Sequence, residues 1–187
     1  EGDLYNKTNL KKSYNDIARL RYFEEVDVQT EKGPDDTQTD VNIRVKEKPT
    51  GMFSIGAGYS AQDAAVFTAS VSQQNLFGRG QSLSLKASLG SRVTNFDISF
   101  IEPWLFNRPL WSRVDLWNFV REYDEYDLDS KGFGFTLGYP LWEHFFGYVG
   151  YRLTVDDVSN IDSDSEYLWD QEGQTTLSSM TDRKSVV

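Results

Sequence analysis

The sequence predicts a mostly β protein: an antiparallel, up-and-down transmembrane β-barrel that follows a partial α+β module. From Gly51 onward, short runs alternate between apolar residues and Gly, Ser or Thr. Successive side chains of a strand point to opposite faces, so this alternation indicates a sheet between two environments. Aromatic residues make up 14% of the chain, and a membrane interface favours such rings. A soluble sandwich alternates too, but an apolar face opposite Gly and Ser fits a membrane barrel better.

Residues 1–49 differ in kind from the rest of the chain. Thr8 is the expected N-cap of a helix that runs to about Tyr22. The segments EEVDVQTE and TDVNIRVKE alternate as two short strands, joined by the turn-forming KGPDDTQT. A helix and a hairpin bury little apolar surface, so we expect a strand and a helix to precede Glu1. Pro49 ends the strand pairing, and residues 50–187 are the expected barrel domain.

The barrel domain is expected to consist of successive antiparallel strands. They are predicted at roughly 51–60, 64–74, 80–90, 94–101, 110–122, 130–139, 145–156 and from about 175. Strand 110–122 alternates less regularly, because Trp117 and Phe119 fall on the same face as Arg113 and Asp115. Either these rings line the barrel interior, or a bulge shifts the register.

The connections between these strands alternate in character. The sequences QDA, SRVT, EYDEYDLD and DDVSNIDSDSEYLWDQEGQ are polar and acidic, whereas QNLFGRGQ, EPWLFNRP and PLWEH carry aromatic residues, Pro and Arg. A meander places alternate connections at the same end, and membrane barrels carry aromatic girdles at both interfaces. We therefore predict a periplasmic membrane-interface girdle of Trp104, Phe106, Trp111, Trp142 and Phe145. Near the opposite interface we expect Tyr59, Tyr123 and Tyr126.

The composition excludes several functions. The net charge is −10 and the pI about 4.6, so no nucleic-acid partner is expected, because phosphate binding needs a basic face. The chain has no cysteine, which leaves no disulfide framework or thiol nucleophile. No apolar run approaches the ~18 residues that a membrane-spanning helix requires.

No catalytic, cofactor or metal site is expected. His144 is the only histidine and lies in an aromatic turn, without a nucleophile elbow or paired metal ligands nearby. The acidic run from Asp156 to Glu166, which includes Asp164, lacks the glycine and spacing of an EF-hand. No helix is expected after Gly78-Arg79-Gly80, so a tight turn is predicted there, with Arg79 available to lipid phosphate.

Several segments resemble one family in their order along the chain. The segments LYNKTNLKKSYNDIARLRYFEEVDVQT and VNIRVKEKPTG resemble the end of a POTRA domain, and FSIGAGYS, SVSQQNLFGRGQSLSL, FIEPWLF and LGYPL follow. Together they resemble the BamA family, central to bacterial outer-membrane β-barrel assembly, over nearly the whole chain. The resemblance implies about 7–8 strands of a sixteen-stranded barrel. The upstream POTRA domains, the other barrel half and the family's Val-Arg-Gly-Phe-type loop have no counterpart here, so we expect a portion of a larger protein.

The resemblance also implies a function, a site and partners. The function is to fold and insert other outer-membrane proteins without covalent chemistry, so no enzyme is expected. The exposed edge of the first strand is implied to be a lateral gate that pairs with a substrate strand. Its residues are Gly51, Met52, Phe53, Ser54, Ile55, Gly56, Ala57, Gly58, Tyr59 and Ser60. Its glycines weaken strand pairing, although steric needs of a barrel interior explain them equally well.

The implied location is the bacterial outer membrane, with the N-terminal module in the periplasm. The implied partners are unfolded outer-membrane β-barrel proteins, accessory lipoproteins of the assembly machinery and outer-membrane lipid; no cofactor is implied. The alternatives are a POTRA-barrel translocator for autotransporter assembly or two-partner secretion, a passive porin, an outer-membrane enzyme and a soluble β-domain. A porin needs no POTRA-like module, and a soluble domain would stay folded and monomeric without detergent.

Overall fold

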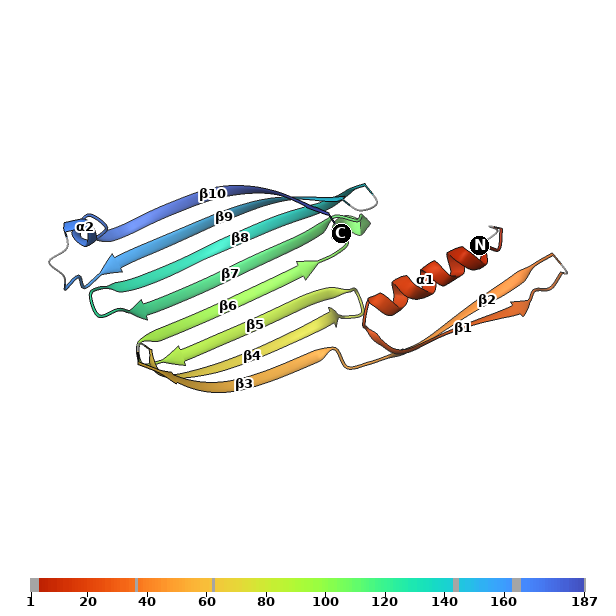
Figure 1. The fold of residues 1–187 in the computed structure, drawn as a ribbon, viewed down its shortest axis with the longest axis horizontal. Coiled ribbons are helices and arrows are strands. Elements are labelled where there is room, and N and C mark those ends of the chain that lie inside the picture. The colour runs from red at the N-terminus through yellow and green to blue at the C-terminus, as the bar shows by residue number, and fades with distance from the viewer. Residues whose placement is uncertain (1–3, 36, 62, 143–144, 163–165, 187) are drawn as a thin grey trace. The chain divides into compact units, whose positions relative to one another are not determined.

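The chain folds into two compact units, Glu1–Thr50 and Gly51–Val187. The structure is a computed structural model that describes residues 4–35, 37–61, 63–142, 145–162 and 166–186 (Figure 1). None of the helices in these ranges is long and apolar enough to cross a membrane.

The first unit begins with helix α1 (Lys7–Arg19), which starts earlier than predicted. Asn6 is the N-cap, because its Oδ1 accepts hydrogen bonds from the backbone N–H groups of Thr8 (2.9 Å) and Asn9 (3.3 Å). The predicted cap at Thr8 was therefore wrong by two residues. The helix also ends before Tyr22, since Arg21 has a left-handed φ of 59° that does not continue a helix.

The rest of the first unit is an antiparallel hairpin of β1 (Phe23–Lys32) and β2 (Thr39–Glu47). Their register places Val26 opposite Val45 and Val28 opposite Ile43, so the apolar residues of both strands share one face. This face stays partly open within the described residues: Ile43 is 44% exposed and Val45 is 45% exposed.

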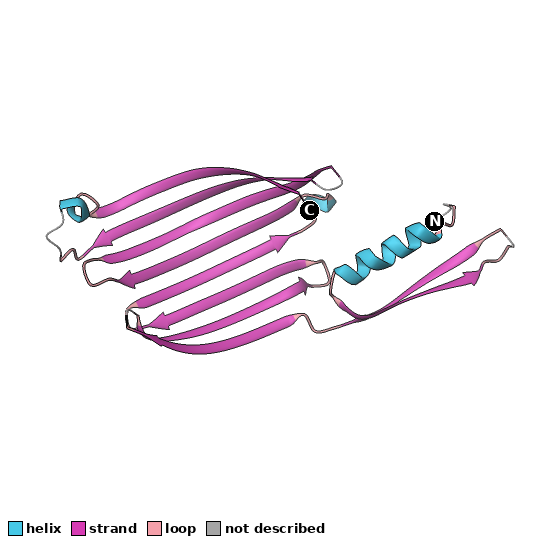
Figure 2. Cartoon of the chain, in the orientation of Figure 1, coloured by secondary structure: helices cyan, strands magenta, loops and turns pink. Residues whose placement is uncertain are grey.

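The second unit is one eight-stranded antiparallel sheet in simple chain order (Figures 1 and 2). Its strands are β3 (Gly51–Ser60), β4 (Ala64–Leu76), β5 (Gln81–Gly90), β6 (Val93–Glu102), β7 (Trp111–Glu122), β8 (Asp127–Trp142), β9 (Phe145–Ser159) and β10 (Gly173–Val186). The 3₁₀ turn η1 (Leu105–Asn107) and the short helix α2 (Glu166–Trp169) lie in connections. The predicted fold class, an antiparallel meander after a small α+β module, is confirmed.

Some boundaries differ from the prediction because cross-strand pairing overrides local composition. β8 begins at Asp127 and reaches Trp142, although both segments carry turn-like sequences. Its ladder with β9 runs from Asp127 opposite Ser159 to Trp142 opposite Phe145, with one irregularity after Pro140. Acidic residues that were predicted to be loop therefore belong to the β8–β9 hairpin. The connection between β7 and β8 consists of residues 123–126 alone.

The register sorts side chains into an apolar face and a polar face. One row across all eight strands is apolar except at its end: Phe53, Val71, Leu85, Ile98, Leu116, Phe133, Leu153 and Ser178. A neighbouring row on the other face is Met52, Ser72, Ser84, Ser99, Asp115, Gly134, Arg152 and Ser179. The two-environment prediction therefore holds across the sheet.

The apolar face is not covered by any other part of the chain that the structure describes. Among these residues the only buried hydrophobic side chain is Val93, at 8% exposure. Ile55 is 71% exposed, Phe67 63% and Leu116 45%. An exposed apolar surface of this extent marks a contact with a membrane or with another protein surface.

Candidate functional site

Strand β3 forms one edge of the sheet and is the candidate site. Within the described ranges it pairs only with β4, from Gly51 opposite Gln73 to Ser60 opposite Ala64, without a bulge. A strand with one neighbour leaves the N–H and C=O groups of its other edge unpaired. The two strands that precede β3 among the described residues, β1 and β2, form a separate sheet.

The glycines of β3 have different surroundings. A Cβ on Gly56 would lie 2.9 Å from Thr68 Oγ1, and one on Gly51 would lie 2.7 Å from Gln73 Oε1. At Gly58, by contrast, an added Cβ would meet nothing within 4 Å. Steric need therefore accounts for part of the glycine pattern but not for Gly58. That glycine weakens β3 with no close packing around it to require it.

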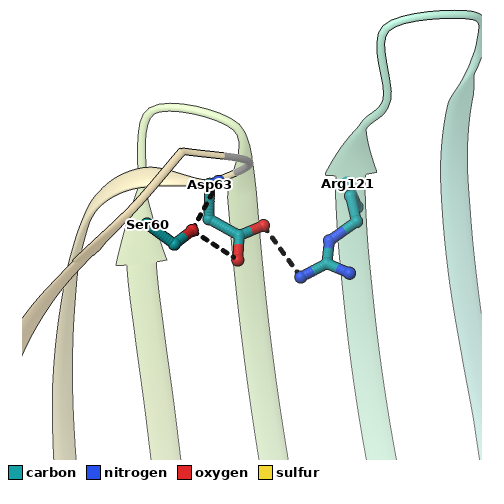
Figure 3. A network of polar contacts seen from close by, with 3 residues as sticks. All are labelled: Ser60, Asp63 and Arg121. Carbon is teal, nitrogen blue, oxygen red and sulfur yellow. Dashed lines mark hydrogen bonds and ion pairs between the residues drawn. The ribbon is translucent and has the colours of Figure 1, made fainter.

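The end of β3 is held by polar contacts around Asp63, in the turn to β4 (Figure 3). The backbone N–H of Asp63 donates to Ser60 Oγ at 2.8 Å, and the Ser60 hydroxyl lies 3.3 Å from Asp63 Oδ2. The other carboxylate oxygen, Oδ1, accepts from Arg121 Nη2 at 2.9 Å. The side chains of Asp63 and Arg121 are 23% and 25% exposed, so this ion pair is partly shielded from water.

The ion pair spans several strands, because Arg121 lies on β7 while Asp63 joins β3 to β4. Neighbouring strands lie about 4.8 Å apart, so a flat sheet would separate β4 and β7 by about 14 Å. The contact bridges the polar side, on which two cavities of about 520 and 480 Å³ also lie. The polar face is therefore the concave face of the sheet.

Aromatic rings hold the Arg121 guanidinium in place. It lies 5.4 Å from the centre of the Phe119 ring and 5.5 Å from that of Tyr123. Tyr123 in turn stacks on Tyr126, with ring centres 4.7 Å apart. The turn that carries Tyr126 therefore helps to fix the cation to which the end of β3 is tied.

The turns at the end of the sheet that carries the acidic connections are also linked to one another. Arg92, between β5 and β6, pairs with Asp124 in the next turn at 2.6 Å. The backbone N–H of Asp162, after β9, donates to the Glu125 carbonyl at 2.9 Å. Residues 123–126 thus connect the turns on both sides of them, and Arg121 beside them extends the contacts to β3.

We expect the Asp63–Arg121 pair to contribute about 1.5–3 kcal/mol of coupling, as charged hydrogen bonds shielded from water do. A double-mutant cycle of Asp63→Asn and Arg121→Gln, measured by urea unfolding of the full-length protein in vesicles, gives this coupling. The matched control is Arg113→Gln with Asp115→Asn, a pair within one strand whose arginine side chain is 45% exposed. Its coupling is expected to stay at about 0.2–1 kcal/mol. Equal couplings would contradict a special role for Asp63.

The polar face carries large and charged side chains. β7 keeps a continuous register with both neighbours, so no bulge displaces Trp117. Trp117 lies on the polar face, where the Arg152 guanidinium stacks 4.5 Å from its ring centre. A Cβ on Gly132 of β8 would collide with that ring, which explains the glycine. Trp117 therefore lies on the polar, concave face without a bulge, as the first of the two predicted alternatives requires.

The predicted girdle residues do not all lie on one surface. Trp104, Phe106, Trp142 and Phe145 are exposed at the same end of the sheet, with exposed fractions of 58, 83, 72 and 45%. The structure places Trp111 on the polar face instead, edge-on to Tyr148 with ring centres 5.8 Å apart. Its spacing of two from Arg113 was the signal that would have placed it there.

Within the described ranges, no group of three or more His, Asp or Glu side chains is arranged to hold a metal ion. The expected absence of a cofactor stays a prediction. His144 and Asp164 lie outside the described residues. Sequence reasoning missed Asp63 and Arg121, because their pairing across 58 residues depends on the curvature of the sheet.

An antiparallel meander with one apolar and one polar, concave face, after a small α+β module, fits the class of β-barrel proteins with an N-terminal POTRA module. Residues 75–184 match the Omp85 superfamily domain, and residues 1–48 match the surface antigen variable number repeat of POTRA domains. The chain belongs to the Omp85 superfamily and is BamA-like.

Individual relatives support this assignment. The chain is 27% identical over 179 residues to the outer membrane protein assembly factor BamA of Nitratidesulfovibrio vulgaris, covering 95% of this chain and 23% of that protein. It is 29% identical over 170 residues to BamA of Neisseria meningitidis serogroup B, covering 83% and 21%. The chain thus spans about a fifth to a quarter of the length of these relatives.

The fold also matches a solved structure. The crystal structure of BamA from Haemophilus ducreyi lacking POTRA domains 1–3 superposes with a TM-score of 0.73 at 22% identity. The match covers 98% of this chain and 38% of that one. At this identity the likeness concerns the fold.

Proposed function

We propose that this chain is part of an outer-membrane assembly factor that folds and inserts β-barrel proteins, and that β3 is the strand on which a substrate strand pairs. The observation that carries the proposal is the open edge of β3 beside a sheet whose apolar face is uncovered. An exposed edge supplies main-chain hydrogen bonds to an incoming strand whatever its side chains are. The substrates are unfolded outer-membrane β-barrel proteins.

This role also assigns surroundings to the apolar face and to residues 1–49. Lipid of the bacterial outer membrane covers the apolar face, and residues 1–49 form the end of a periplasmic POTRA domain that receives substrates and accessory lipoproteins. In the proposed role the eight-stranded sheet is part of a closed barrel; this chain covers 23% and 21% of the two matched relatives. The closing strand meets β3, so β3 is the movable side of a lateral gate. Trp104, Phe106, Trp142 and Phe145 lie at the periplasmic interface.

The edge role predicts that strengthening β3 slows assembly. Gly58→Ala adds a methyl group into open space and favours the extended strand by about 0.5–1 kcal/mol. If β3 must loosen from its neighbours, the rate at which vesicles containing the full-length protein assemble a substrate barrel falls about two- to fivefold. The matched control is Gly134→Ala on the central strand β8, where a Cβ also fits, 3.5 Å from the nearest atom. Equal rates for the two variants would contradict the proposal.

A further inference from the structure

Two turns at the aromatic end of the sheet share an unusual feature. In the turn from β4 to β5, Phe77 is followed two residues later by Arg79. In the turn from β6 to β7, Phe106 is followed two residues later by Arg108. Both phenylalanines are 83% exposed, and both arginines are exposed. The two turns lie at the same end because an antiparallel meander returns to that end after every second strand.

The backbone holds both rings in a conformation that large residues rarely adopt. Phe77 has a φ of 55° and Phe106 a φ of 58°, both in the left-handed region. Such strain persists only where the surroundings enforce it, and it gathers at functional positions. Exposure of the phenylalanine ring to water does not offset the free-energy cost of this backbone conformation.

Hydrogen bonds close each of the two turns. In the first turn, the N–H of Gly80 donates to Asn75 Oδ1 at 2.8 Å. In the second, the N–H of Trp104 donates to Glu102 Oε1 at 2.9 Å, and that of Leu105 donates to the Leu110 carbonyl at 3.0 Å. Both turns are therefore built to present their phenylalanine at the tip.

Arg79 and Arg108 have no carboxylate partner in the part of the chain that the structure describes, a feature that Arg44 and Arg183 share. Among the residues that the structure describes, neither Arg79 nor Arg108 has an ion pair or a side-chain hydrogen bond. Arg92, Arg113 and Arg121 each pair with an aspartate. In a chain with 29 acidic and 19 basic residues, two exposed arginines without a carboxylate are available for an external anion.

We infer that these two turns bind phosphate groups of anionic phospholipids in the adjoining leaflet. The phenylalanine enters the acyl boundary while the guanidinium, a fork of N–H donors, meets a lipid phosphate. The inference rests on the proposed membrane location of the sheet and adds a lipid class and four residues to it. Phospholipid is favoured over a protein partner because the same apolar–cationic pair occurs on two turns that border the apolar face.

Lipid retention by the detergent-solubilised full-length protein tests the role of the arginines. Native mass spectrometry follows phosphatidylglycerol and phosphatidylcholine over a titration, for the unchanged protein and for Arg79→Gln/Arg108→Gln. We expect phosphatidylglycerol to bind more tightly than phosphatidylcholine. The affinity for phosphatidylglycerol is expected to fall about fivefold for each arginine that is replaced. The control with the same charge change is Arg44→Gln/Arg183→Gln, in which Arg44 lies on β2 and Arg183 on the polar face. Equal weakening in the control, or no preference for phosphatidylglycerol, would overturn the inference.

Spin labels in vesicles of phosphatidylcholine and phosphatidylglycerol test the position of the rings. Single labelled cysteines replace Phe77, Phe106, Leu85 on the apolar face and Arg183 on the polar face. Labels at 77 and 106 are expected to be accessible to oxygen but not to a water-soluble nickel chelate. Nickel accessibility at both, with protection at 85, overturns the lipid inference and leaves the membrane location intact. Nickel accessibility at 85 as well refutes the membrane location itself.

Discussion

Leu85→Arg is expected to destabilise the membrane-embedded protein by about 2–4 kcal/mol, the cost of a cation on the lipid face near the middle of a barrel. Leu85 lies within the apolar row that crosses the sheet, between Val71 on β4 and Ile98 on β6. It is 40% exposed within the chain, so the new side chain would meet whatever covers this face. The free energy of unfolding from vesicles in a urea titration measures the effect.

The control for this prediction is Ser84→Arg, one residue away on the same strand. Ser84 points to the polar face, where it lines a cavity with Lys86 and Asp97. A cation there remains beside water and a carboxylate, so we expect a change within about 0.5 kcal/mol. A similar loss for both variants would mean that the two faces do not differ in environment.

Gly132→Ala is expected to cost about 1–3 kcal/mol, the usual range for overpacking a tight site. The new Cβ would lie 2.5 Å from the Leu153 carbonyl oxygen and 2.7 Å from Trp117 Cε2. The carbonyl belongs to the backbone of β9, and the ring is held by Arg152, so neither moves freely. Urea unfolding of the full-length protein in vesicles reports the loss.

Two further variants separate the causes of this loss. Trp117→Ala in the Gly132→Ala background removes the ring contact and should restore only part of the stability, since the carbonyl contact remains. Gly134→Ala, two residues along β8 with its nearest atom at 3.5 Å, should change stability little. A neutral Gly132→Ala would show that the sheet relaxes more easily than its register implies.

The strand array could be predicted from the sequence because its signal is local. An alternation of period two appears in any single strand, so β3 was located at Gly51–Ser60 without knowledge of its neighbours. The face of Trp117 could not be assigned in this way. Its neighbours on the strand suggested two answers, and only the unbroken pairing of β7 with β6 and β8 decides between them.

Three features could not be predicted from the sequence: one ion pair of the candidate site, the helix cap and the bounds of β8. Asp63 and Arg121 meet only because the sheet curves over its polar face. The helix cap was misassigned because Asn6 and Thr8 are both good caps, and hydrogen-bond geometry selects the first. The extension of β8 into acidic residues arises from pairing with β9, which local propensity does not contain.

Crosslinking along β3 tests the central claim most directly. Single cysteines at each of positions 52–60 of the full-length protein are combined with cysteines on the terminal strand of a stalled substrate barrel. The chain itself has no cysteine that would compete. If the β3 edge pairs with the substrate, disulfides form along 52–60 in a consistent antiparallel or parallel register. Single cysteines at positions 130–139 of β8, a strand remote from the edge, form the comparison set. Crosslinks confined to that set would contradict this account.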